Sequence, residues 1–190
     1  MARQAAGTDS ALTTAAMARS SSHAAAPARA ASVGALPLVL LSTVAVAVID
    51  GLFAIVVYVV FGTTTITRLF QSIASALIGA GAFRGGTTTF LLGIALHCTV
   101  ALAWSIIFLL LLRGTRFVPR MLDSRLGALK VAAWYGPLVY VAMSLALVPL
   151  FTHRVPPINA MWTLVLIGHI PFVALPIAAI VGRAARGWSA

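Results

Sequence analysis

The chain has 190 residues, of which 61% are hydrophobic and only 8% are charged, whereas about 25% of an ordinary soluble domain is charged. A soluble fold of this size still exposes roughly a third of the surface of its unfolded chain, so this composition excludes an ordinary soluble protein. The net charge of +10 does not indicate nucleic-acid binding, because no basic stripe with interleaved aromatic residues accompanies it.

Residues 1–32 are rich in Ala, Ser, Thr and Arg and hold few larger apolar side chains. Such a segment buries too little apolar surface to fold by itself, so we expect a disordered tail. Because it is basic and poor in acidic residues, a transit peptide is an alternative interpretation. The alanine-rich composition favours a cytoplasmic tail of a bacterial protein.

Four long apolar runs follow, and each has a length that suits a membrane-spanning helix. They cover residues 36–61, 90–112, 128–151 and 161–181. The first run is too long for the apolar part of a signal peptide, which has about 7–15 residues. The sequence therefore predicts an all-α membrane protein, with a bundle of four transmembrane helices between residues 33 and 183.

A shorter segment, residues 69–83, lies between the first two runs and is bounded by Arg68 and Arg84. It is too short to cross a bilayer, which takes about 20 residues, so we predict a short interfacial or re-entrant helix. Its polar or small residues recur at helical spacing and form one candidate face: Gln71, Ser72, Ser75 and Gly79. The glycines that follow do not form a dinucleotide fingerprint, since neither the strand before nor the acidic residue after them is present.

The basic residues predict the orientation in the membrane. Ten lie in the tail, between the second and third runs, or at the C-terminus: Arg3, Arg19, Arg29, Arg113, Arg116, Arg120, Arg125, Lys130, Arg183 and Arg186. Only Arg68, Arg84 and Arg154 lie on the other side. The positive-inside rule then places both termini, including residues 184–190, in the cytoplasm. Basic residues on that face are expected to contact anionic lipid as well as the bilayer itself.

One polar group lies inside each of the four runs: Asp50, His97, Tyr140 and His169. Ionisable groups at the centre of a spanning helix cost about 2.5–3.5 kcal/mol on insertion scales, so their positions carry information. At a rise of about 1.5 Å per residue, His97 and His169 lie roughly 10–12 Å below the outer interface, and Asp50 and Tyr140 roughly 16 Å below it. The four groups therefore form a polar layer about one helical turn thick.

Three interpretations of this layer remain open. The groups can hold the bundle together by interhelical hydrogen bonds. Asp50, His97 and His169 can instead relay protons or bind a cation, or His97 and His169 can ligate a haem b iron or another metal. No catalytic motif is recognisable, and the single cysteine, Cys98, lies in an apolar run and cannot form an intramolecular disulfide.

The segment from Phe70 to Gly79, followed by Ala82-Phe83-Arg84-Gly85-Gly86 and by Leu92-Gly93 through His97, resembles an FQSIASGLLG-type pattern of uncharacterised four-span bacterial inner-membrane proteins. The chain departs from that pattern at Ala76, where glycine is expected. Pro149-Leu150, Pro156-Pro157 and Gly168-His169 are similar, more loosely, to YagU-like membrane proteins. Both resemblances imply a bacterial inner membrane, and neither implies a known activity.

These observations predict a non-enzymatic membrane protein, either a small transporter or channel component or a structural subunit, without a resident cofactor. The alternative is an electron-transfer protein that holds haem through His97 and His169. A pore built from so small a chain would need partner subunits, so a homo-oligomer is one expected assembly.

Overall fold

The computed structural model describes residues 34–186, with side chains as far as residue 184. Within that range the chain forms helices and their connections and contains no strand. The predicted disordered tail, residues 1–32, and the last residues of the predicted C-terminal segment lie outside the described part. The all-helical fold class is confirmed for the part that the structure describes.

Helices of three kinds follow one another along the chain. Helix α2 (Ala35–Ile55) continues into a π-helical segment, η1 (Val56–Val60). Helix α3 (Ile66–Ile78) is followed by the 3-10 helix η2 (Gly79–Arg84), by the long α4 (Gly86–Gly114) and by the short α5 (Phe117–Leu122). The remaining elements form two interrupted helices: α6 (Gly127–Val141) with π-helical η3 (Ala142–Leu147) and α7 (Val148–Thr152), and α8 (Ala160–His169) with π-helical η4 (Ile170–Ala174), α9 (Leu175–Val181) and α10 (Arg183–Arg186).

Five helical stretches in residues 34–186 are long and apolar enough to cross a membrane. Four of them, Ala35–Val60, Gly86–Gly114, Gly127–Thr152 and Ala160–Val181, contain the four predicted apolar runs almost entirely. The fifth is Ile66–Arg84, with 19 residues. It begins before the predicted short helix because the Thr65 side chain caps it, accepting a hydrogen bond from the Arg68 amide at 3.2 Å. Length alone therefore does not decide between four and five spans.

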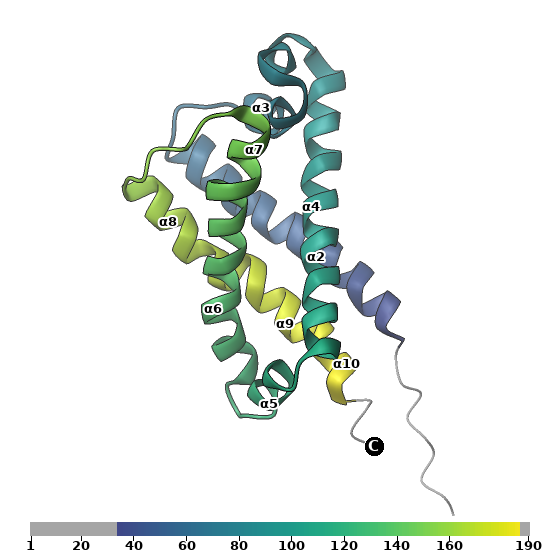
Figure 1. Cartoon of the computed structure of the whole chain (residues 1–190). Helices are drawn as coiled ribbons and strands as arrows, with labels where there is room; N and C mark the ends of the chain where they lie inside the picture. Colours follow the sequence, from purple (N-terminus) through teal and green to yellow (C-terminus); the bar gives the residue numbers. More distant parts are fainter. Residues whose placement is uncertain (1–33, 187–190) are drawn as a thin grey trace, which may run out of the picture. The chain divides into compact units, whose positions relative to one another are not determined.

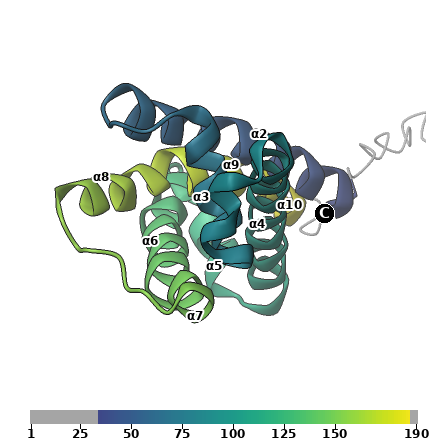
Figure 2. The ribbon, with the colours of Figure 1, turned by 90° about the horizontal axis from the view of Figure 1, so that it is seen from above.

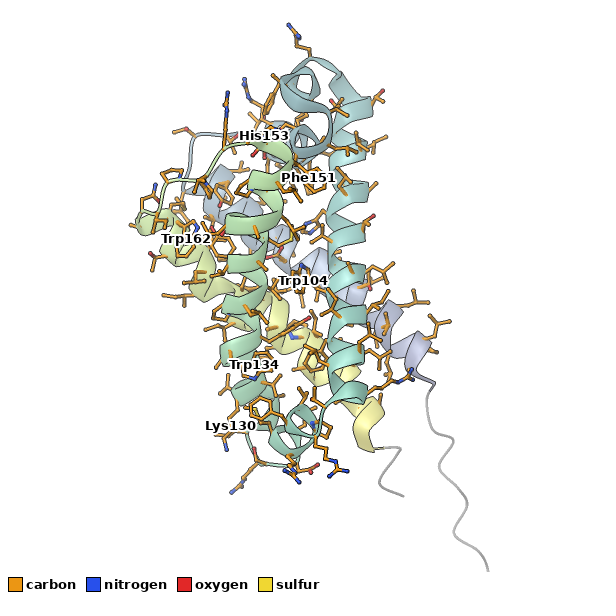
Figure 3. All side chains as sticks on the ribbon, viewed as in Figure 1. Trp104, Lys130, Trp134, Phe151, His153 and Trp162 are labelled. Atoms are coloured by element: carbon orange, nitrogen blue, oxygen red, sulfur yellow. The ribbon has the colours of Figure 1, made fainter. Side chains whose placement is uncertain are left out.

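The four longest stretches alternate in direction (Figure 1), so that the beginning of α2 and the end of α10 lie at the same end of the bundle. Helix α5 lies at this end, which we call the α5 end. The opposite end, here called the α3 end, carries α3 and α7. Seen from above, α3 lies across this end, whereas α4 is viewed nearly along its axis (Figure 2). The labelled side chains mark the two ends: His153 lies at the α3 end and Lys130 at the α5 end (Figure 3).

The best-buried apolar core lies in the half of the bundle nearer the α5 end. Its largest fully buried apolar side chains come from α4, α5, α6 and α9 and include Phe108, Leu112, Val131, Ile177 and Val181, none more than 1% exposed. Tyr135 also lies in this core, and its hydroxyl donates a hydrogen bond to the Trp104 carbonyl oxygen at 2.7 Å. This half of the bundle is therefore closed by packed side chains, and the Tyr135 hydroxyl joins α6 to α4.

A pair of buried serines fixes the register between α2 and α4. The Oγ atoms of Ser42 and Ser105 lie 3.0 Å apart and form a hydrogen bond, and both side chains are fully buried. Hydrogen bonds between membrane helices contribute about 0.6 kcal/mol on average. The contact is therefore more informative about geometry than about stability.

We expect a disulfide to form readily when Ser42→Cys and Ser105→Cys are combined in a Cys98→Ser background. The two Oγ atoms already point at each other at 3.0 Å, which satisfies the need for side-chain vectors that converge. Crosslinking is read on a non-reducing gel. Thr43→Cys with Ser105→Cys is the matched control, because the Thr43 hydroxyl is directed to its own helix, at Val39 O. Equal crosslinking of both pairs would contradict this register.

Candidate functional site

Asp50 on α2 is the one carboxylate within the spanning helices that the structure describes. It is partly buried, and the imidazoles of His169 and His97 lie within electrostatic range of its carboxylate. These side chains come from the end of α8 and the middle of α4. The structure thus brings together three of the four members of the predicted polar layer around one acidic group.

His97 is held against α2 by its ring nitrogen. Its Nε2 atom lies 3.1 Å from the carbonyl oxygen of Ala47, and because a carbonyl can only accept, Nε2–H is the donor. A Cβ added at Gly51 would lie 3.5 Å from the same Nε2 atom, so the small residues at 47 and 51 make room for the imidazole beside Asp50. In the neutral ring the Nδ1 atom then remains a proton acceptor.

His169 is held by the other ring nitrogen, Nδ1. Its Nδ1 atom lies 2.8 Å from the Val165 carbonyl oxygen in the same helix, so Nδ1–H donates and Nε2 is the acceptor in the neutral ring. The imidazole packs on the Tyr140 ring, with centroids 4.7 Å apart. One ring nitrogen of each histidine near Asp50 therefore donates to a backbone carbonyl, and the other nitrogen of the neutral ring can accept a proton.

Two glycines allow the helices around His169 to approach closely. A Cβ at Gly136 on α6 would lie 2.7 Å from the His169 carbonyl oxygen, and a Cβ at Gly168 would lie 2.2 Å from the Phe53 ring. Pro171 lies two residues after His169, within η4, and cannot donate a backbone hydrogen bond. The glycine contacts and the wide π-helical turn together determine the direction in which His169 faces.

Tyr140, the fourth predicted member, contacts His169 and also packs on Trp162, with ring centroids 5.2 Å apart. A fifth group, Tyr58 on η1, was not predicted as part of the layer. Its hydroxyl interacts electrostatically with Asp50 and with Tyr140. Eight residues of regular α-helix would turn Tyr58 roughly 80° away from Asp50, but the wider π-helical turn reduces this offset. No sequence signal marks that turn.

The predicted polar face of the short helix has mainly local contacts. Gln71 is 4% exposed, and its Nε2 atom donates to Gly86 O at 3.1 Å and to Thr89 Oγ1 at 3.3 Å. Thr89 in turn donates to Ala82 O at 2.6 Å. Ser72 and Ser75 donate to the carbonyls of Leu69 and Ser72 in their own helix. Gln71 thus braces α3 against the start of α4, and the two serines bond along the helix.

The geometry offers less to a metal or a haem than to a proton. Within residues 34–186 no three His, Cys, Asp or Glu side chains are placed to hold one metal ion together. To present its Nε2 atom to an iron, His97 would have to release the Ala47 carbonyl. The arrangement that exists is a carboxylate and two hydrogen-bonded imidazoles, which is a set of groups suited to exchanging protons.

No protein-family model, curated protein or solved structure matches the chain. The resemblances drawn from the sequence therefore stay predictions.

Proposed function

We propose that the chain is a four-span protein of the bacterial inner membrane, with both termini in the cytoplasm and α3 at the outer interface. Two observations support this topology. The ends of the bundle formed by α2 and α10 lie together, as an even number of spans requires, and α3 lies across the other end (Figures 1 and 2). The α5 end also carries most of the basic residues of the bundle, including Arg116, Arg120 and Lys130.

We further propose that the polar site carries protons, as part of a small transporter or channel. The observation that supports this proposal is that imidazoles from two other helices lie within electrostatic range of the Asp50 carboxylate, and each imidazole has one nitrogen left to accept a proton. Ionisable groups within a bilayer are costly and commonly mark ion or proton pathways. Asp50 would hold the proton, and His97 and His169 would take it up and release it.

A purely structural role for these groups makes a different prediction. If the polar contacts only hold the helices together, their loss lowers stability and changes no flux. Replacement of Asp50 by asparagine separates the two roles, because asparagine has nearly the same shape and can still form hydrogen bonds but cannot carry a proton.

The test is proton flux into liposomes that contain the purified protein and a trapped pH-sensitive dye, with a potassium diffusion potential as the driving force. We expect the wild type to acidify the lumen and Asp50→Asn to fall to the rate of empty liposomes. Asp123→Asn is the matched control, since Asp123 follows α5 outside the bundle interior, and it should retain the wild-type rate. A wild type no faster than empty liposomes, or an Asp50→Asn variant as fast as wild type, would contradict the proposal.

A further inference from the structure

The polar site is not surrounded equally on its two sides. Toward the α5 end lies the closed apolar core of Phe108, Leu112, Ile177 and Val181, none more than 1% exposed. Toward the α3 end lie aromatic groups with polar atoms, including Tyr58 beyond Asp50 on η1 and Trp162 in the first turn of α8. The most tightly buried apolar side chains therefore separate the polar site from the α5 end.

Helix α3 contacts His97 through one side chain. The Phe70 ring packs edge-on against the His97 imidazole, with centroids 6.1 Å apart, and against the Phe90 ring at 5.6 Å. The helix approaches α4 closely at this point, because a Cβ on Gly93 would lie only 1.9 Å from the Phe70 carbonyl oxygen. Phe70 is thus pressed onto the histidine that donates to Ala47.

The connections of α3 suit a part that moves as a unit. It follows the non-helical residues 61–65 and ends at Gly79, whose φ of 67° is in the left-handed region that glycine adopts readily. Gly86, at the start of α4, also has a positive φ, of 56°. The hydrogen bonds from Gln71 to Gly86 and Thr89 hold α3 against the start of α4. Hinges of lids are typically a few terminal residues that absorb backbone rotation.

We propose that α3 is a gate over the Asp50 site. In the closed state described here, Phe70 separates His97 from the α3 side of the membrane, and displacement of α3 opens the site to that side while the core at the α5 end stays closed. This inference rests on the proposed function, because a proton-coupled carrier needs a gate on one side of its site. One-sided access controlled by Phe70 can be tested without measuring proton flux.

The test uses a single cysteine, His97→Cys, in a Cys98→Ser background, and the rate at which a membrane-impermeant thiol reagent labels it in sealed vesicles of either orientation. Thr64→Cys lies in a connection at the α3 end and Ser124→Cys in one at the α5 end. Their labelling shows which end of the bundle faces the outside of the vesicles. We expect the His97→Cys variant to be labelled slowly from the α3 side. Adding Phe70→Ala should raise this labelling rate by at least about tenfold, or about 1.4 kcal/mol. Labelling from the α5 side should stay absent in both.

Phe90→Ala is the matched control, because it removes a ring of the same size that packs on Phe70 rather than on His97 in the described contacts. Phe70→Leu is the milder variant and should give an intermediate rate if Phe70→Ala does not fold. Unchanged labelling in both Phe70 variants, equal acceleration by Phe90→Ala, or labelling from the α5 side would overturn the gate. Because labelling needs no proton transport, a failed flux experiment with a positive labelling result would reject the proposed function and leave the gate in place.

Discussion

Replacement of Gly93 by alanine is expected to destabilise the bundle by about 2 kcal/mol. The new Cβ would lie 1.9 Å from the carbonyl oxygen of Phe70, which is main chain and cannot rotate away. Overpacking costs about 1–3 kcal/mol and occasionally more, while the change from glycine to alanine inside a helix returns only about 1 kcal/mol. The contact is severe, so the cost exceeds the gain. Thermal unfolding of the purified protein in mild detergent measures the difference.

Gly114→Ala is the control for this variant, because Gly114 ends the same helix and nothing lies within 4 Å of its added Cβ. Gly114→Ala should leave the unfolding temperature unchanged or raise it slightly. If the two alanine variants unfold at the same temperature, α3 does not pack on α4 as described here, and the basis of the gate is lost with it.

Replacement of His169 by asparagine is expected to reduce proton flux by at least about tenfold, equivalent to about 1.4 kcal/mol on the rate-limiting step. Asparagine removes a titratable group that acts on Asp50 and also the ring that packs on Tyr140 at 4.7 Å. Asp50 is then left with His97 as its single imidazole partner. The measurement is the liposome flux described above, at equal protein content.

His153→Asn is the control, since His153 lies in the turn after α7 and has a φ of 53°, a conformation that asparagine tolerates well. Its flux should match the wild type. A His169→Asn variant that transports as well as His153→Asn would show that the imidazole at 169 has only a packing role.

The long helices could be predicted from the sequence because their signal is local. An apolar run of 20 or more residues between charged, glycine and proline positions needs no tertiary information. The predicted bounds differ from those of α2–η1, α6–α7 and α8–α9 by about one residue. The start of α3 could have been found from Thr65, a residue type that caps helices. The prediction of a short helix began after Arg68 instead and so missed the first turn.

The composition of the polar site could be predicted in part, because ionisable groups are rare in apolar runs and each one stands out. Whether their faces converge could not, since helix rotation depends on contacts such as Gly136 against His169 and Gly168 against Phe53. Tyr58 was missed because a π-helical turn, which no pattern marks, alters its direction. Ser72 and Ser75 share helical spacing with Gln71, but spacing alone does not distinguish a bond along the helix from a functional polar face.

The central claim is that the Asp50 carboxyl carries a proton under the influence of the imidazoles of His97 and His169, and infrared difference spectroscopy of the carboxyl group tests it most directly. The chain has three acidic side chains, Asp9, Asp50 and Asp123, and no glutamate, so a pH-dependent carboxyl band that disappears in Asp50→Asn can be assigned to one residue. We expect the midpoint of that band to move when either His97→Asn or His169→Asn is introduced, and to stay in place in His153→Asn. A midpoint that neither histidine moves would contradict the account.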